Sequence, residues 1–189
     1  MRVRMVLEEK KIPYTVIEED LSNPSETLLR LHPQGLVPLL IHAGQVIYES
    51  AIINEYLDEV FTDHRLNVCT PTERAQMRLW THWCNDIFKA DVDLLKYQFN
   101  DLDDLKKSML VIRLKEHLAK INFSLKDREF LMGETVSLAD IHVFPFVRQL
   151  VRIKSEFISL SEYPKVMTWL ERICQRPSFE RVMAKPAKV

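Results

Sequence analysis

Residues 35–50, with the sequence GLVPLLIHAGQVIYES, decide the architecture of the first third of the chain. The apolar run at 37–41 predicts one strand, and the β-branched run at 45–48 predicts a second. Ala43-Gly44 between them suits a tight turn, so the two strands are expected to form an antiparallel hairpin. Glu49-Ser50 follows the hairpin directly, and Ser50 is expected to cap the next helix.

The sequence before the hairpin mixes helical and strand patterns. A helix is expected up to Lys11, where Pro13 ends it, and the stretch at 14–18 predicts a short strand. A second helix is expected to start at Ser22-Asn23-Pro24 and to end at His32-Pro33-Gln34-Gly35. The strands on either side of this helix would then form a βαβ unit with parallel pairing.

The rest of the chain is predicted to be helical. The helix after the hairpin has an apolar stripe, which is expected to be buried and consists of Ile52, Ile53, Tyr56, Leu57 and Val60. Periodicity lapses from Thr62 to Pro71, which indicates a linker. Four helices are expected after it, at 72–97, 102–125, 137–153 and 163–174. The fold class is therefore α/β plus all-α, with a small α/β domain at 1–61 and a helical domain at 72–189.

Composition excludes several classes of protein. Lys and Arg number 26 against 27 Asp and Glu, and this balance argues against a general nucleic-acid binder. The longest apolar run, at 36–41, is too short to span a membrane, and the N-terminus has no signal-peptide pattern. Neither the histidines nor the three cysteines, Cys69, Cys84 and Cys174, have metal-ligand spacing. No metal, nucleic-acid or membrane partner is expected, and a reducing cytoplasm fits best.

Two motifs in the first domain allow both a structural and a functional interpretation. Pro38 is either an ordinary proline of an edge strand or part of a cis Val37–Pro38 peptide whose Val37 backbone faces a ligand. Ser50 is expected as a helix cap, but a helix N-terminus also offers free N–H groups to an anion. There Ser50 could hold a carboxylate and Glu49 an ammonium, two groups that an α-amino acid carries together.

A third motif lies in the helical domain and indicates stability rather than chemistry. Ser137 and Asp140 have the spacing of a capping box, and Val136 and Ile141 flank it as a hydrophobic staple. Asp140 is therefore expected to stabilise the fold and not to take part in catalysis.

Taken in order, these motifs resemble the cytosolic glutathione transferase superfamily over nearly the whole chain. The N-terminal helix with Ile12-Pro13-Tyr14 agrees, as do three features near the C-terminus: Tyr163-Pro164, Trp169 and Arg176-Pro177-Ser178. The resemblance implies a thioredoxin-like first domain, a C-terminal helical bundle, and a cytoplasmic homodimer.

The resemblance also implies a function. The protein would bind reduced glutathione and transfer it to a hydrophobic electrophile. The Val37 backbone, beside cis Pro38, would pair with the cysteinyl part of glutathione, while Glu49 and Ser50 would hold the γ-glutamyl ammonium and carboxylate. A pocket for the electrophile would lie on the long helix at 72–97, with core packing as the alternative for each aromatic residue; its candidates are Trp80, Trp83, Asn85 and Phe88.

The chain departs from the family at its start. In the family, a strand and a turn with a catalytic Tyr, Ser or Cys precede the first helix, whereas Met1 already matches a helical residue. No residue is therefore assigned to activation of the glutathione thiol, and a further segment is expected upstream. The missing turn favours a second hypothesis, a non-catalytic interaction or regulatory protein like the stringent starvation protein. A carrier of apolar ligands is a third.

Overall fold

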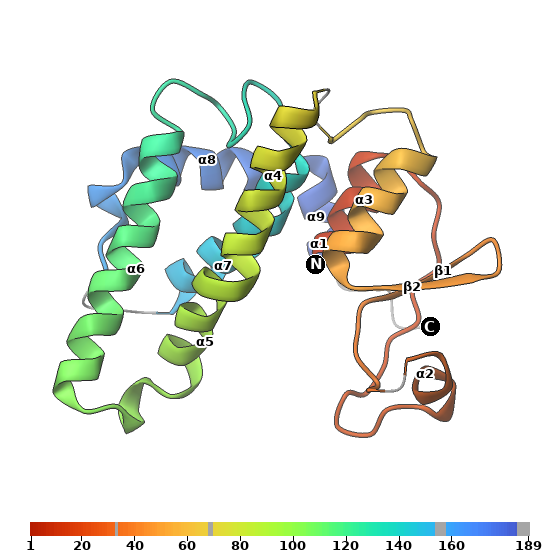
Figure 1. The fold of residues 1–189 in the computed structure, drawn as a ribbon, viewed down its shortest axis with the longest axis horizontal. Coiled ribbons are helices and arrows are strands. Elements are labelled where there is room, and N and C mark those ends of the chain that lie inside the picture. Colours follow the sequence, from red (N-terminus) through yellow and green to blue (C-terminus); the bar gives the residue numbers. More distant parts are fainter. Residues whose placement is uncertain (33, 68–69, 154–157, 185–189) are drawn as a thin grey trace. The chain divides into compact units, whose positions relative to one another are not determined.

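The computed structural model describes residues 1–32, 34–67, 70–153 and 158–184. The chain divides into two compact units, Met1–Leu66 and Asn67–Val189 (Figure 1). The first unit contains α1 (Arg2–Glu9), α2 (Glu26–Leu31), β1 (Leu39–His42), β2 (Gln45–Tyr48) and α3 (Ser50–Val60). The predicted class, an α/β unit followed by a helical unit, is confirmed.

The predicted hairpin is confirmed. Strands β1 and β2 pair antiparallel, with Leu39 opposite Tyr48. Ala43 and Gly44 have φ angles of 49° and 77°, so both turn residues adopt the left-handed backbone that a two-residue hairpin turn requires. Pro38 lies just before β1, where it removes no donor from the sheet.

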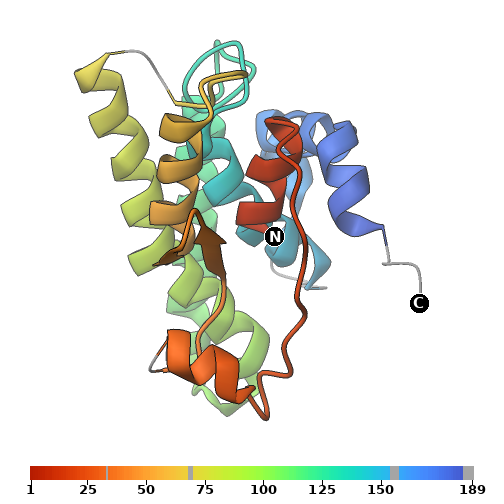
Figure 2. The ribbon, with the colours of Figure 1, turned by 90° about the vertical axis from the view of Figure 1, so that its right-hand side faces the viewer.

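The predicted strand at 14–18 is wrong, and so is the parallel pairing that depended on it. Residues 14–18 form a loop between α1 and α2, which Figure 2 shows without a neighbouring strand. The sheet of the described residues has only two strands, β1 and β2. β-branched residues supply a preference for extended backbone, but a strand also needs a partner for its N–H and C=O groups. Val16 and Ile17 are accordingly 42% and 78% exposed.

Helix α2 begins later than predicted. Its cap is Ser25, whose Oγ accepts the N–H of Leu28 at 3.1 Å. Ser22 instead donates its hydroxyl to the side chain of Asp20, so the local hydrogen bond of Ser22 competes with the capping role. Pro33, in the predicted end of this helix, lies outside the described residues.

The core of the first unit lies between α1 and α3 and contains a buried ion pair. Lys10 Nζ lies 2.7 Å from Asp58 Oδ1, and the two side chains are 0% and 2% exposed. Lys10 also donates to the carbonyl oxygens of Asp63 and His64, while Asp58 accepts the N–H of Leu66. These bonds fasten the start of the predicted linker to the first unit.

The predicted apolar stripe of α3 is partly wrong. Ile53 and Leu57 are buried, but Ile52 and Val60 are 58% and 46% exposed. The buried face of α3 is shifted toward Asp58, which can enter the core because Lys10 neutralises its charge.

The second unit is helical. It contains α4 (Pro71–Trp83), α5 (Lys89–Tyr97), α6 (Asp104–Ser124), α7 (Leu138–Arg152), α8 (Pro164–Cys174) and α9 (Pro177–Met183), with short turns η1 (Cys84–Phe88), η2 (Phe99–Asp101) and η3 (Leu160–Glu162). The four predicted helices are present. The π-helical turn η1 joins α4 to α5 and interrupts the predicted helix at 72–97. Helix α7 lies at the centre of this unit, in contact with α4, α5 and α8.

The predicted capping box is confirmed and anchors α7 within the second unit. Asp140 is fully buried, and its Oδ2 accepts the backbone N–H and the hydroxyl of Ser137 at 2.9 and 2.6 Å. Its Oδ1 accepts the N–H of Leu131 and the indole N–H of Trp169, each at 2.8 Å. Burial raises the pKa of Asp140, and these hydrogen bonds oppose that rise. Asp140 thus ties α7 to the preceding loop and to α8.

Among the described helices, none combines the length and the apolar character needed to cross a membrane.

Candidate functional site

The hairpin brings the two motifs of the first unit to one place. Because Leu39 is opposite Tyr48, the residues next to this pair, Pro38 and Glu49, lie at the same end of the hairpin. The Val37–Pro38 peptide bond is cis, which is one of the two alternatives that the sequence left open. Val37, Pro38 and Glu49 are exposed, and Ser50 is half-buried. All four predicted residues of the glutathione site are therefore within one accessible region.

Ser50 is the first residue of α3 and not its cap, contrary to the prediction. Glu49 occupies the cap position with a φ of 68°, and it makes no side-chain cap bond within the described part of the chain. By contrast, the side chains of Ser25, Thr70 and Asp103 cap α2, α4 and α6. The start of α3 thus keeps backbone N–H groups and the positive end of the helix dipole available to an anion.

Arg2 contributes to the same region and was not predicted. Its Nη1 lies 3.4 Å from Ser50 Oγ, at a separation of 48 residues along the chain. The guanidinium adds a positive charge at the start of α3. Only the packing of α1 against α3 brings Arg2 there, and no short-range pattern in the sequence signals it.

The predicted aromatic residues lie in the second unit, where three of them pack in series. The ring centroids of Trp80 and Trp83 are 5.3 Å apart in an edge arrangement, and those of Trp83 and Phe88 are 5.2 Å apart and stacked. Phe88 is 0% and Trp83 9% exposed, so both belong to the core of this unit. Trp80 and Asn85 are half-buried and are the more accessible of the predicted residues.

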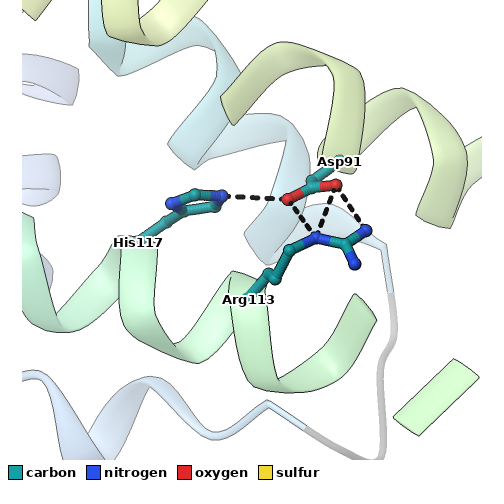
Figure 3. Close-up of polar contacts among 3 residues, drawn as sticks. All are labelled: Asp91, Arg113 and His117. Atoms are coloured by element: carbon teal, nitrogen blue, oxygen red, sulfur yellow. Dashed lines mark hydrogen bonds and ion pairs between the residues drawn. The ribbon is translucent and has the colours of Figure 1, made fainter. Parts of the chain in front are cut away.

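Figure 3 shows a polar cluster that was not predicted, formed by Asp91, Arg113 and His117. Arg113 of α6 donates hydrogen bonds to the carboxylate of Asp91 of α5. Its Nε lies 3.1 Å from Oδ1 and 3.0 Å from Oδ2, and its Nη2 lies 2.8 Å from Oδ1. His117 Nε2 lies 3.0 Å from Asp91 Oδ2. The His117 ring meets the rings of Trp83 and Phe88 at 5.5 Å. The cluster therefore joins α5 to α6, and its histidine contacts two of the predicted aromatic rings.

The environment of Asp91 favours its ionised form. Burial opposes ionisation, but the hydrogen bonds and charges of Arg113 and His117 outweigh it and hold the pKa of Asp91 below its ordinary value. Arg113, His117 and Lys120 follow one another at i, i+4 and i+7, so they share one face of α6. That spacing could have revealed this basic face of α6 from the sequence. The acidic partner, Asp91, lies on α5, and the spacing of residues within α6 gives no information about it.

Asp91→Asn is expected to lower the free energy of unfolding of the second unit by about 2 kcal/mol at neutral pH, because hydrogen bonds to charged groups are lost. Since the pKa of Asp91 is lowered in the fold, this stability is present above the unfolded pKa of about 3.9 and disappears as pH falls through the folded-state pKa. Urea unfolding followed by tryptophan fluorescence reports on this unit, because all three tryptophans lie in it. The free energies of unfolding of the wild type and of Asp91→Asn should become equal in acid.

The exposed Lys89–Asp93 pair on α5 supplies the control for this experiment. Asp93→Asn is expected to change stability by less than about 1 kcal/mol, as is usual for surface ion pairs. A difference between wild type and Asp91→Asn that stays constant down to strongly acidic pH would contradict the ionic character of the Asp91 cluster.

No group of three or more His, Cys, Asp or Glu side chains suited to a metal ion occurs among the residues that the structure describes. Cys84 and Cys174 form no disulfide among the described residues, and the thiol of Cys84 donates a hydrogen bond to the carbonyl oxygen of His142 at 3.4 Å. Cys69 lies outside the described residues.

Comparison with known proteins decides the family. Models of the glutathione S-transferase N-terminal domain and C-terminal domain match residues 1–60 and 106–177. A protein of Nicotiana tabacum named "Probable glutathione S-transferase parC" is 31% identical over 195 residues, covering 100% of this chain and 86% of its own length. The chain belongs to the glutathione S-transferase family.

Solved structures of other glutathione S-transferases share the fold. The Tau class enzyme of mango, Mangifera indica, has a TM-score of 0.86 and 26% identity, covering 97% of this chain and 87% of its own. A theta class enzyme of Xanthomonas axonopodis pv. citri, solved with glutathione bound, has a TM-score of 0.82 and 24% identity, covering 98% and 92%. The resemblance noted from the motifs is thereby confirmed.

Proposed function

We propose that this glutathione S-transferase binds reduced glutathione in its first unit and transfers it to a hydrophobic electrophile. The observation that carries the proposal is the meeting of Val37-Pro38 and Glu49-Ser50 at one end of the hairpin, beside the uncapped start of α3. The bound glutathione of the Xanthomonas relative supports the choice of ligand.

Each group of this region suits one part of glutathione. The γ-glutamyl carboxylate would accept hydrogen bonds from Ser50 and from the first N–H groups of α3, near the Arg2 guanidinium. The γ-glutamyl ammonium would pair with the exposed carboxylate of Glu49. The backbone of Val37 lies outside β1, so its N–H and C=O are not used in the sheet and could pair with the cysteinyl backbone.

The chemical step is a displacement or addition by sulfur. The glutathione thiol gives its proton to solvent water, and the thiolate forms a C–S bond with the electrophilic carbon. In a displacement, the leaving group departs with its bonding electron pair; in an addition, the π-electron pair moves to the far atom of the double bond, which takes up a proton from water. The electrophile would bind in the second unit at the half-buried Trp80 and Asn85, with Trp83 and Phe88 supporting Trp80 from the core. Aromatic surface of this kind favours apolar ligands.

We propose further, from the family alone, that the protein is a homodimer and is located in the cytoplasm.

Titration calorimetry with reduced glutathione at neutral pH is expected to show saturable binding. Glu49→Gln and Ser50→Ala should each weaken it about tenfold, since each removes a charge-assisted contact. Glu59→Gln removes one carboxylate from the exposed far end of α3 and should leave the affinity unchanged. Turnover of a generic aromatic electrophile would then separate a transferase from a protein that only binds glutathione.

Two results would count against the proposal. Absence of binding in a protein that still unfolds cooperatively would favour the alternative, an interaction or regulatory protein of the same fold. Equal losses of glutathione affinity in Glu49→Gln and Glu59→Gln would show that net charge governs binding and that the start of α3 is not the glutathione site.

A further inference from the structure

An exposed apolar corner, formed by Pro24, Leu29 and Leu36, lies beside the hairpin site. Leu29 and Leu36 are 45% and 50% exposed, although both are large aliphatic side chains. Gly35, the neighbour of Leu36, packs closely against the other two residues. A Cβ atom on this glycine would lie 3.1 Å from Cδ2 of Leu29 and 3.4 Å from Cβ and Cγ of Pro24. The three side chains of the corner carry no charge, so the corner offers only apolar contact to a ligand.

The order of residues in the site determines which part of a bound peptide meets this corner. In the proposed function, the γ-glutamyl part lies at Glu49-Ser50 and the cysteinyl backbone pairs with Val37. Pro38, on one side of Val37, lies at the same end of the hairpin as Glu49-Ser50, and Leu36 lies on the other side. The peptide would therefore run antiparallel to this segment, with its third residue opposite Leu36. Side chains of directly opposite residues point to the same face, with Cβ atoms about 4.5–5.5 Å apart.

We propose that the site takes γ-glutamylcysteinyl peptides whose third residue is apolar and binds them more tightly than glutathione. Glycine, the third residue of glutathione, has no side chain and leaves Leu29 and Leu36 in contact with water. A leucine in its place would cover part of both side chains, and withdrawing apolar surface from water favours binding. The peptide's terminal carboxylate can stay hydrated, because the corner is at the surface. The inference rests on the proposed function, since it narrows the thiol substrate of the same site.

Titration calorimetry of the full chain with glutathione and with γ-glutamyl-cysteinyl-leucine tests the inference. Leu36→Ala removes most of the side chain opposite the third residue and keeps the backbone of Val37. Ile41→Ala is the matched control, because Ile41 is an aliphatic residue of β1 that is 56% exposed and lies nearer the turn of the hairpin. The readout is the ratio of the two affinities in each protein.

The wild type should bind the leucine peptide about fivefold more tightly than glutathione. In Leu36→Ala the ratio should fall to about one through weaker binding of the leucine peptide, whereas Ile41→Ala should keep the wild-type ratio. Equal affinities in the wild type, or a preference that survives Leu36→Ala, would overturn the inference, while binding of glutathione would still support the proposed function. Absence of binding by both peptides would overturn the inference and the proposed function together.

Discussion

Asp140→Ala is expected to lower the free energy of unfolding of the second unit by about 4 kcal/mol, because it leaves several buried donors without an acceptor, each costing roughly 1–3 kcal/mol. The carboxylate accepts hydrogen bonds from Leu131, Ser137 and Trp169, which are 0%, 3% and 1% exposed. Water cannot easily replace the lost acceptor at such a depth. Urea unfolding followed by tryptophan fluorescence measures the effect, and Trp169 itself is one of the reporters.

The cap of α6 provides a matched control for this variant. Asp103 accepts the N–H of Lys106 at 2.8 Å, but its side chain is 55% exposed. Asp103→Ala should therefore cost only about 1 kcal/mol, the usual value of a helix cap. A loss below about 1 kcal/mol for Asp140→Ala would show that the bonds to Leu131 and Trp169 contribute little, and that Asp140 acts as an ordinary cap.

Features that depend on neighbours in the sequence were predicted well. The strand at 45–48, its turn at Ala43-Gly44 and the Ser137–Asp140 box all follow from residues a few positions apart. The strand at 14–18 failed because its existence depends on a partner strand, which residue propensity does not report. Ser50 was misplaced by one position because Glu49 adopts a positive φ, which is uncommon for a residue other than glycine.

Among the residues of the candidate sites, those in short sequence motifs were predicted, and those brought in by helix packing were missed. The residues of the hairpin site were predicted from short motifs, and the register of the hairpin brings them together. Arg2 and Asp91 were missed because each reaches its partners only through helix packing, across 48 and 22 or more residues. The prediction of an apolar stripe on α3 missed the burial of Asp58. The charge that neutralises Asp58 belongs to Lys10, which follows the end of α1 and reaches Asp58 only when the two helices pack together.

Asp58→Ala is expected to destabilise the first unit by about 4 kcal/mol, because removing one partner of a buried ion pair leaves the other charge uncompensated. The Lys10 ammonium is 0% exposed, and among the described residues only the carbonyl oxygens of Asp63 and His64 would remain as its hydrogen-bond acceptors. No tryptophan lies in this unit, so hydrogen exchange of peptides from α1 and α3 is the suitable measurement. Exchange in both helices should accelerate, while peptides from α6 and α7 remain protected.

The double variant Lys10→Met, Asp58→Leu identifies the origin of that loss. If the cost arises from the lone charge, replacing both partners by apolar side chains should restore most of the stability, as for other buried ion pairs. If the bonds to Asp63, His64 and Leu66 dominate, the double variant should be less stable than Asp58→Ala, since it loses all three bonds whereas Asp58→Ala loses only the one to Leu66. Glu18→Ala removes the exposed partner of Arg4 and should change stability by less than about 1 kcal/mol. We expect the first outcome, because the free energy of withdrawing a charge from water exceeds what its hydrogen bonds to the neighbouring backbone groups return.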